Sequence, residues 1–346
     1  MVESEQGSGV LELLDQLCME ALQSESLSQV KENFRKVGHS DLDRLDVIAR
    51  TAVEREIGQI LNSRTVERAR YYAKNLQNGL RTYSKSDADA FNINLWKGYD
   101  HIITGSLWNF GPRARGGQHK GWYWGNFIPQ IPFQLISRYT KPGDWVVDPF
   151  CGSGTTLLEA MKLGRNSLGV ELNSEVYQKT TELVNNASAK ANTRTVLELQ
   201  DSMEFDFPGF VEKEKIPKFK LAILHPPYWD IIKFSENPRD FSMAKDSEDF
   251  TTKLANLAKG ILPAMDTGSH IGLVIGDIYR NGEVIPLGFR SMDALSNLGL
   301  KLRGIIVKDI QNTRAKRNSE NLWRYRALKS GFYVFKHEYV FVFKYH

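Results

Sequence analysis

Cysteine is scarce in this sequence: only Cys18 and Cys151 occur among 346 residues. Two cysteines cannot build a disulfide framework or a cysteine-rich zinc site, so we expect a reduced, cytoplasmic protein. Long apolar runs are missing as well, since no stretch approaches the roughly 20 residues that a membrane span needs. The first five residues are acidic and polar, which is not typical of a signal peptide.

A large excess of charge of either sign is also absent. The formal net charge is +4, and 41% of the residues are hydrophobic against 25% charged, as in ordinary globular proteins. At roughly 100–200 residues per domain, this length favours two domains. The mildly basic balance agrees with a polyanionic partner but does not identify one.

Proline is absent from residues 1–111, and this absence favours long helices in the first part of the chain. Apolar residues recur at helical spacing over residues 10–21, 27–37 and 42–52, with an N-cap at Ser40 or Asp41. We therefore predict a helical region over residues 1–90 that binds DNA or another protein. The polar residues 84–89 read as a linker.

Short apolar segments alternate with amphipathic ones from about residue 140. Strands are expected at 145–148, 167–171, 196–199, 221–224, 271–275 and 339–343, and helices at 157–163, 175–191 and 250–265. This alternation is typical of an α/β fold with a mostly parallel, doubly wound, Rossmann-like sheet.

A glycine-rich turn joins the first of these strands to its helix. Glycines allow a tight turn, and the following helix presents its N-terminal amides to a ligand. Glu171 ends the next strand, where an acid accepts hydrogen bonds from ribose hydroxyls. Asp201 follows the third strand, a position that lies beside adenine in such folds. Phosphate binding of the Walker type is disfavoured because no Lys-Ser/Thr pair follows the glycines.

The spelling of this turn, Asp-Pro-Phe-Cys-Gly-Ser-Gly-Thr-Thr at residues 148–156, closely resembles the cofactor motif of the DNA amino-methyltransferases, the adenine-N6 and cytosine-N4 enzymes. Residues 129–136 and 139–144 resemble the segment that closes over the methionine part of S-adenosylmethionine (SAM) in that family. The resemblance implies a SAM-dependent methyltransferase domain over residues 91–346. The cofactor-binding residues that it implies are Asp148, Pro149, Phe150, Gly152, Gly154, Thr155, Thr156, Glu171 and Asp201.

A second motif, His225-Pro226-Pro227-Tyr228, follows the expected strand at 221–224. It resembles the family's catalytic Asp/Asn/Ser-Pro-Pro-Tyr/Phe tetrapeptide. An exocyclic amine is a poor nucleophile because its lone pair is delocalised into the ring. The first residue and the first proline carbonyl would accept hydrogen bonds from its two N–H groups, and Tyr228 would stack on a base flipped out of the helix. These four residues are the predicted catalytic set.

Histidine at the first position departs from the family spelling. A neutral imidazole accepts one hydrogen bond, but an imidazolium accepts none. We therefore expect activity to fall below about pH 6.5, the ordinary histidine pKa. Tyrosine followed by tryptophan resembles cytosine-N4 members slightly more than adenine-N6 members. Cytosine-C5 chemistry is disfavoured because neither cysteine stands in a Pro-Cys motif.

Basic residues gather in two segments that we expect to contact nucleic acid. Residues 301–329 interleave positive charge with amides and aromatics, which suits phosphates and bases. A second basic loop precedes residues 122–124. The predicted contacts are Trp229, Arg314, Lys316, Arg317, Arg324, Arg326, Arg113 and Arg115. No spacing typical of metal ligands is present, and the proposed transfer needs no metal.

The sequence thus predicts a SAM-dependent DNA methyltransferase that acts on cytosine N4 or adenine N6, with DNA and possible restriction or defence subunits as partners. An RNA base N-methyltransferase of the same fold stays open, since such enzymes share these motifs. A nucleic-acid-binding module that lost catalysis at His225 also stays open. Oligomeric state and target sequence are not indicated.

Overall fold

The computed structural model describes most of the chain as two compact units, Met1–Ile102 and Ile103–His346. The division falls later than the predicted boundary at residue 90, and the predicted linker at 84–89 lies outside the described residues. The described residues are 3–43, 45, 47–83, 93–113, 123, 125–188, 193–229, 237, 239–310 and 320–346.

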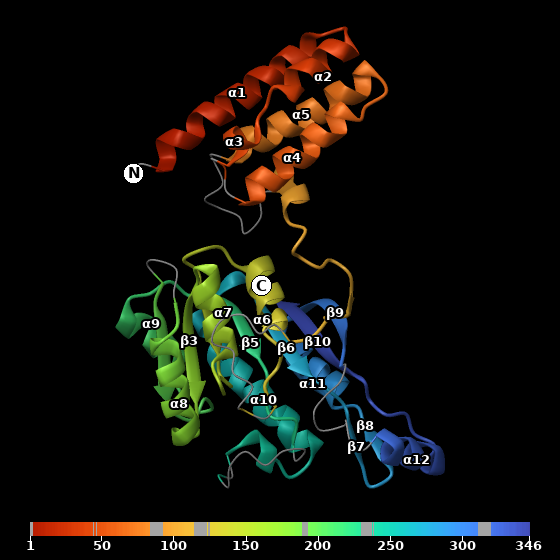
Figure 1. Ribbon diagram of the computed structural model, residues 1–346. Helices are drawn as coiled ribbons and strands as arrows, with labels where there is room; N and C mark the ends of the chain where they lie inside the picture. Colours follow the sequence, from red (N-terminus) through yellow and green to blue (C-terminus); the bar gives the residue numbers. More distant parts are fainter. Residues whose placement is uncertain are drawn as a thin grey trace. The chain divides into compact units, whose positions relative to one another are not determined.

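The first unit is a bundle of helices with its own apolar core (Figure 1). Leu95 is buried in this core, which explains why the unit extends past residue 90. The third predicted helix is two helices, and its predicted N-cap at Ser40 or Asp41 is wrong: Gly38 is the N-cap, and Asp41 accepts from the Gly38 amide in the first turn. No helix of the described residues is long and apolar enough to cross a membrane. The elements are α1 (Glu3–Gln23), α2 (Leu27–Arg35), α3 (His39–Leu42), α4 (Val47–Leu61), α5 (Val66–Tyr83) and η1 (Ile93–Gly98).

An eight-stranded sheet forms the centre of the second unit, in the order β1-β9-β10-β6-β5-β2-β3-β4. Strands β2 to β6 pair in parallel, whereas β10 runs antiparallel between β6 and β9. The predicted doubly wound sheet is confirmed. The strands are β1 (Leu107–Trp108), β2 (Trp145–Asp148), β3 (Asn166–Glu171), β4 (Thr195–Leu199), β5 (Phe219–Leu224), β6 (Met265–Ile275), β9 (Lys301–Asp309) and β10 (His337–Lys344).

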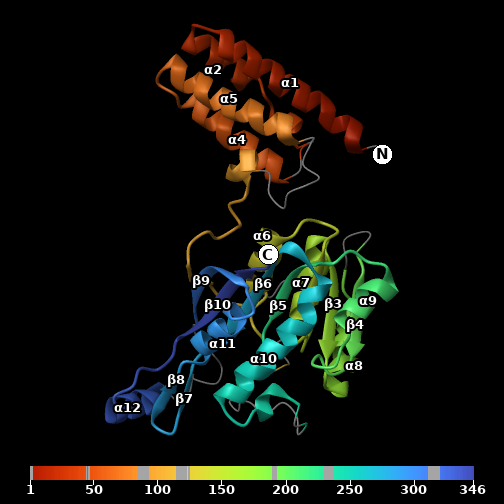
Figure 2. The same ribbon diagram turned by 180° about the vertical axis from the view of Figure 1, so that it is seen from behind.

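Helices cover both faces of this sheet, as Figures 1 and 2 show from opposite sides. Successive residues of β2 point to opposite faces, so Val146 packs in one core and Val147 in the other. Burial on both faces explains why the central strands read as continuous apolar runs. The covering helices are α6 (Gln130–Tyr139) and α7 (Thr155–Leu163) on the Val146 side, and α9 (Phe207–Glu214), α10 (Ser247–Ile261) and α11 (Leu287–Ser296) on the Val147 side.

Helix α8 (Ser174–Asn185) also packs on the sheet, against β3 and β4. The other elements are the 3-10 turns η3 (Phe241–Met243) and η4 (Leu262–Ala264), the hairpin β7 (Ile278–Arg280) and β8 (Glu283–Ile285), and α12 (Glu320–Ser330). The hairpin, β1, β9 and α12 were not predicted from the sequence. The segment 301–309 in particular was interpreted as a basic surface, but it is a paired strand.

Strand order reverses between β2 and β5. The chain winds from β2 outward to β3 and β4, then returns to β5 on the other side of β2. Ligands of doubly wound folds bind at this switch point, outside the carboxyl ends of the strands. Because Val147 of β2 pairs with Ala222 of β5, the turn after β2 and the residues after β5 meet at one edge of the sheet.

Candidate active site

The glycine turn (residues 149–154) is closed by its own hydrogen bonds. Gly152 and Gly154 have φ angles of +51° and +73°, which side chains rarely adopt. Asp148 is buried and accepts hydrogen bonds from the Phe150 amide and the Thr156 hydroxyl. Burial raises the pKa of Asp148 to about 6. Its carboxylate therefore holds the turn in shape, rather than facing an open site.

Two acids lie at the carboxyl ends of neighbouring strands: Glu171 is the last residue of β3, and Asp201 follows β4. Glu171 is 8% exposed and accepts from the amides of Gly152 and Asn173, each at 2.8 Å. Asp201 accepts from the Met203 amide through Oδ1, but its buried Oδ2 has no hydrogen-bond partner in the described structure. Arg239 is an ion-pair neighbour of that oxygen at 3.6 Å.

The unsatisfied oxygen of Asp201 provides a test of whether these residues fit SAM. A buried acceptor without a donor is costly, so such an atom calls for a partner. The exocyclic amine of an adenine is a donor of the right kind. Each Glu171 oxygen uses one lone pair on the backbone and keeps another for a ribose hydroxyl. The acids therefore fit the adenosine part of the cofactor.

Three further residues lie against the glycine turn and were not predicted as site residues. A Cβ at Gly152 would stand 2.9 Å from the Tyr123 ring, so Tyr123 covers the turn closely. Thr180 donates a hydrogen bond from its hydroxyl to the Gly152 carbonyl at 2.8 Å. Asn126 donates to the Ser153 hydroxyl and accepts from that of Thr155. Only Asn126 had a sequence signal, because it lies just before the segment that resembles the methionine-side motif.

Asn126 also links the glycine turn to the catalytic motif. The next residue, Phe127, places its ring 4.5 Å from the imidazole of His225, in an edge-to-face arrangement. One short stretch of chain therefore holds the cofactor turn on one side and His225 on the other. The two predicted motifs, which are far apart in the sequence, are brought together by this stretch.

The tetrapeptide leaves two hydrogen-bond acceptors open. His225 follows the last residue of β5 and lies between the rings of Phe127 and Tyr228, with centroids at 4.5 and 5.6 Å. Within the described residues, its ring nitrogens make no hydrogen bond, and the Pro226 carbonyl accepts none. The carbonyl of Pro227, by contrast, accepts from the Trp229 amide at 2.8 Å.

The electrostatics of His225 change one expectation. Burial lowers the pKa of His225 to about 4; Glu338 opposes this shift and Lys308 adds to it. The imidazole is then neutral, and able to accept a hydrogen bond, well below pH 6.5. We therefore expect the fall of activity nearer pH 4 than pH 6.5.

A buried ion pair holds the last member of the tetrapeptide. Lys308 of β9 and Glu338 of β10, 7% and 8% exposed, approach to 2.9 Å. Glu338 also accepts a hydrogen bond from the Tyr228 hydroxyl at 2.9 Å. Burial and the Glu338 carboxylate raise the pKa of Tyr228 well above its ordinary value. Lys308 lay in the predicted basic segment, but it is committed to this pair rather than to a phosphate.

Trp229 is a second departure from the expectations. It is 5% exposed, and its indole N–H donates to the Ala244 carbonyl. Its backbone has a positive φ of 47°, and Arg280 lies over its ring at 4.8 Å. This burial contradicts the prediction that Trp229 extends a stacking platform for nucleic acid, and we do not retain it.

The predicted basic contacts are only partly visible. Arg115, Arg314, Lys316 and Arg317 lie outside the described residues. Arg324 and Arg326 are exposed on α12, with Arg326 over the Trp323 ring at 5.4 Å.

Arg113 is part of the site rather than of an open loop. It is partly buried, and one of its terminal nitrogens donates to the Asn126 and Phe127 carbonyls, each at 3.3 Å. Burial lowers the pKa of Arg113. No group of metal-ligating side chains occurs in the described part of the chain.

Comparison with known proteins agrees with these observations. Residues 65–182 match the family of DNA methylases that act on N6 and N4. The chain is 36% identical over 76 residues to the type II methyltransferase M.MthZI of Methanothermobacter thermautotrophicus. The aligned stretch covers 22% of this chain and 21% of that protein. It is 39% identical over 82 residues to the DNA adenine methyltransferase YhdJ of Escherichia coli, covering 22% and 26%.

A likeness to solved structures exists at lower similarity. The crystal structure of TrmN from Thermus thermophilus aligns with a TM-score of 0.42 and 16% identity, covering 64% of this chain and 49% of that one. The strand order and its switch point define a doubly wound, Rossmann-like α/β fold. Within that class, the chain resembles the DNA amino-methyltransferases, as its motifs predicted, and SAM is the cofactor of that family. The matched stretches span only about a quarter or less of these relatives' own length.

Proposed function

We propose that this protein transfers a methyl group from SAM to an exocyclic amino group of a base in DNA, with cytosine N4 favoured over adenine N6. The observation that carries the proposal is the pair of open acceptors, on His225 and Pro226, beside the glycine turn. The preference for cytosine N4 rests on the Tyr228-Trp229 spelling alone.

The open acceptors suit the chemistry of an amine. The lone pair of an exocyclic amine is delocalised into its ring, and two acceptors on its N–H groups favour a pyramidal nitrogen. The neutral imidazole of His225 and the Pro226 carbonyl provide these two positions. The Tyr228 ring, held by Glu338, offers a face for the flipped base. SAM, when bound, supplies the electrophilic methyl group.

The cofactor would lie along the carboxyl ends of β2, β3 and β4. Asp201 would accept from the adenine amine and Glu171 from the ribose hydroxyls. The glycine turn and the helix α7 that follows it would face the methionine part, with Asn126 fixing the turn from outside. This chain's own contribution is positioning, since the reactive group belongs to the cofactor.

DNA would approach from the side of α12. Arg324 and Arg326 are exposed there and can neutralise phosphates. Arg314, Lys316, Arg317 and Arg115 remain proposed contacts on the strength of their charge. Methyltransferases of this family include members of restriction systems, so a restriction or defence subunit is the partner that we propose.

The test is mass spectrometry of nucleosides from DNA and from RNA, each incubated with the protein and isotope-labelled SAM. Labelled N4-methylcytosine in DNA is the expected product. Labelled N6-methyladenine in DNA would keep the activity and correct the atom. Label in RNA alone would move the substrate to RNA. No label in either, with SAM binding measured separately, would reject catalysis and leave a binding module.

A further inference from the structure

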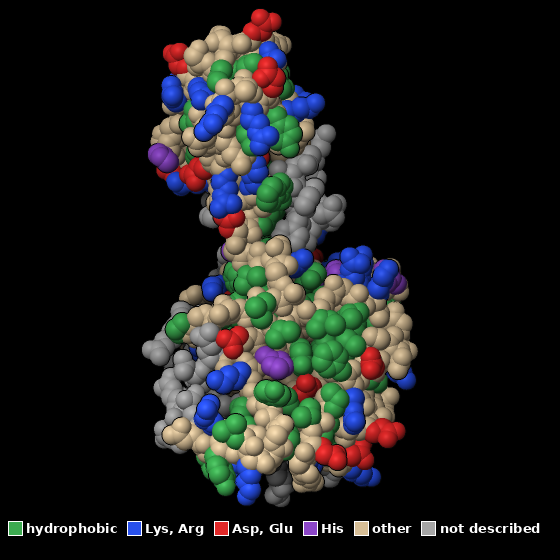
Figure 3. All heavy atoms as spheres, turned by 90° about the vertical axis from the view of Figure 1, so that its right-hand side faces the viewer, with side chains coloured by type: hydrophobic (Ala, Val, Ile, Leu, Met, Phe, Trp, Pro, Cys, Tyr) green, Lys and Arg blue, Asp and Glu red, His purple; other side chains and the backbone are tan. Residues whose placement is uncertain are grey.

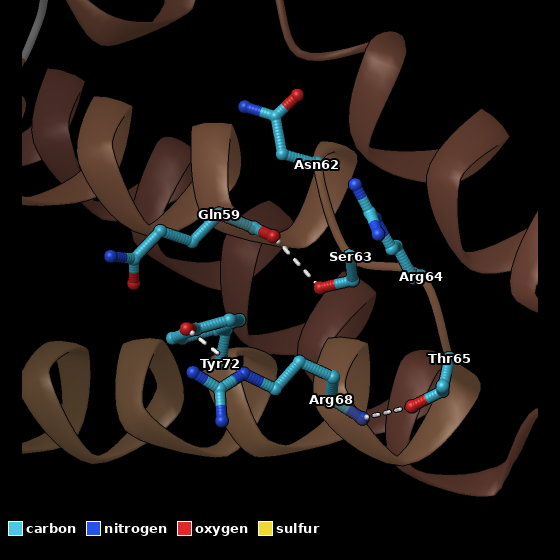
Figure 4. A pocket seen from close by; sticks show the side chains of 7 residues that line it. All are labelled: Gln59, Asn62, Ser63, Arg64, Thr65, Arg68 and Tyr72. Carbon is cyan, nitrogen blue, oxygen red and sulfur yellow. Dashed lines mark hydrogen bonds between the residues drawn. The ribbon is translucent and has the colours of Figure 1, made fainter.

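The helical unit contains a pocket of about 450 Å³ where α4 turns into α5. Figure 4 shows its side chains, which come from the end of α4, the turn and the first turns of α5. None of the described residues that line it is acidic. They are Gln59, Asn62, Ser63, Arg64, Thr65, Arg68 and Tyr72.

The hydroxyls of Ser63 and Thr65 donate within the protein, to the Gln59 carbonyl and the Glu67 carboxylate, so the spare donors of the pocket belong to amide and guanidinium groups. Gln59 accepts from Lys97 at 2.6 Å through its side-chain oxygen, so its amide nitrogen remains. Thr65 caps α5 by accepting from the Arg68 amide at 3.2 Å. Arg68 donates one N–H to the Tyr72 hydroxyl at 3.1 Å, which fixes its guanidinium and leaves four N–H bonds. A pocket lined by spare donors fits a ligand rich in acceptors.

Charge points to an anion. Arg64 and Arg68 are both exposed, and neither has an acidic partner among the described residues. Lys97 is different, because Glu56 pairs with it at 2.7 Å and cancels its charge. Glu67 lies beside the pocket and accepts a hydrogen bond from the Thr65 side chain, so the two arginines outnumber one neighbouring carboxylate. Guanidinium groups bind phosphate oxygens with two parallel hydrogen bonds.

Aromatic rings lie against two cations of this region, Arg68 and Lys97. Tyr71 is 57% exposed and Trp96 61% exposed. The Arg68 guanidinium lies 5.1 Å from the Tyr72 ring and 5.9 Å from the Tyr71 ring, and Lys97 lies 5.7 Å from Trp96. Figure 3 shows Lys and Arg side chains on one face of the helical unit, with hydrophobic and some acidic side chains among them. Aromatic faces interleaved with cations are typical of surfaces that follow a nucleic-acid strand.

We propose that this pocket binds a backbone phosphate of the nucleic acid, with Arg64 and Arg68 on the phosphate and the neighbouring rings against the adjoining sugar and base. The inference rests on the proposed function, because it takes the substrate of the second unit to be DNA. It gives the helical unit a task of its own: holding the substrate at a second point.

The test uses the full chain and a fluorescein-labelled duplex without SAM, followed by fluorescence anisotropy over a range of salt. The double variant Arg64→Ala/Arg68→Ala is compared with Arg35→Ala/Lys36→Ala, which removes the same charge from the exposed end of α2. The pocket variant should raise Kd by about tenfold or more and lower the salt slope by about 0.9, the value for one lost phosphate contact. The control should change Kd less than about twofold.

Equal changes in the two variants would overturn the proposal, because charge alone would then explain them. Thymidine 5′-monophosphate serves as the probe for a free nucleotide. If it binds the pocket while duplex binding is the same in both proteins, the ligand is a small nucleotide and the proposal fails. Methyl transfer is measured in parallel. Absence of transfer in the wild type with loss of duplex binding in the pocket variant would reject the proposed function alone.

Discussion

The glycine turn and the catalytic tetrapeptide are adjacent, but they differ in whether their hydrogen-bond acceptors are already occupied. At the turn, Asp148 and Glu171 accept hydrogen bonds from the backbone that they shape. At the tetrapeptide, the acceptors of His225 and Pro226 stay open, whereas the Tyr228 side chain donates a hydrogen bond to Glu338. Folding itself therefore completes the cofactor turn, whereas the tetrapeptide is completed only when a substrate amine arrives.

The strongest test of this contrast removes the open acceptor. His225→Ala should lower kcat by about 100- to 10,000-fold, as loss of a catalytic group in contact with the reacting atom does. The Kd for SAM, measured by calorimetry, should stay within about twofold because His225 takes no part in the turn's hydrogen bonds. A comparable loss of SAM affinity would show that the two regions are not separate.

His225→Asn is the matched control. An asparagine carbonyl accepts a hydrogen bond and occurs at this position in the family that the motif resembles. It should recover part of the activity that alanine loses. If asparagine is as inactive as alanine, the acceptor role is wrong and the imidazole has another task.

Next in size is the buried pair behind Tyr228. Glu338→Ala leaves Lys308 charged and unpaired in a site where both are under a tenth exposed. Such a loss costs about 3–5 kcal/mol of stability, to be measured by urea unfolding. Tyr228→Phe is the control, since it removes one hydrogen bond worth about 1 kcal/mol and leaves the pair intact. Equal costs would mean that the ion pair contributes little.

The turn itself can be tested with two glycines that share a positive φ. Gly154→Ala would bring a Cβ within 2.8 Å of Thr180, whereas a Cβ at Gly143, with φ of +86°, meets nothing within 4 Å. Both variants lose about 1–2 kcal/mol to the left-handed conformation. Only Gly154→Ala should also weaken SAM binding. If Gly143→Ala weakens it equally, backbone strain and not the close packing at Thr180 is responsible.

The sequence predicted the strands and the two motifs because each depends on local chemistry. Strand 145–148 matches β2 at both ends, and the glycine turn and Glu171 stand where the spelling placed them. The position of His225 at the end of a central strand also followed, since the motif comes directly after the predicted strand 221–224.

The features that the sequence did not predict depend on contacts between residues that are far apart in the chain. Lys308 looked like a surface charge until its partner, Glu338, was placed beside it by strands that are 28 residues or more apart. Trp229 looked like a platform, but its burial depends on Ala244. The lowered pKa of His225 depends on burial by Phe127 and its other neighbours, which no local pattern reveals.

The smallest expected effect is the pH dependence of kcat and of KM for SAM, which should differ between the tetrapeptide and the glycine turn. The pKa of His225 is about 4, so at pH 5.5 the imidazole is still neutral and kcat at saturating SAM should change less than about twofold from pH 7.5. Loss of the acceptor follows protonation, so lowering the pKa moves the fall of kcat to lower pH. Asp148 titrates near pH 6 instead, and its protonation withdraws the carboxylate that holds the turn, so KM for SAM should rise below that pH. A pH profile with kcat falling near 6.5 and KM unchanged would reverse the assignment: the imidazole would be the solvated group, and the buried turn would be insensitive to acid.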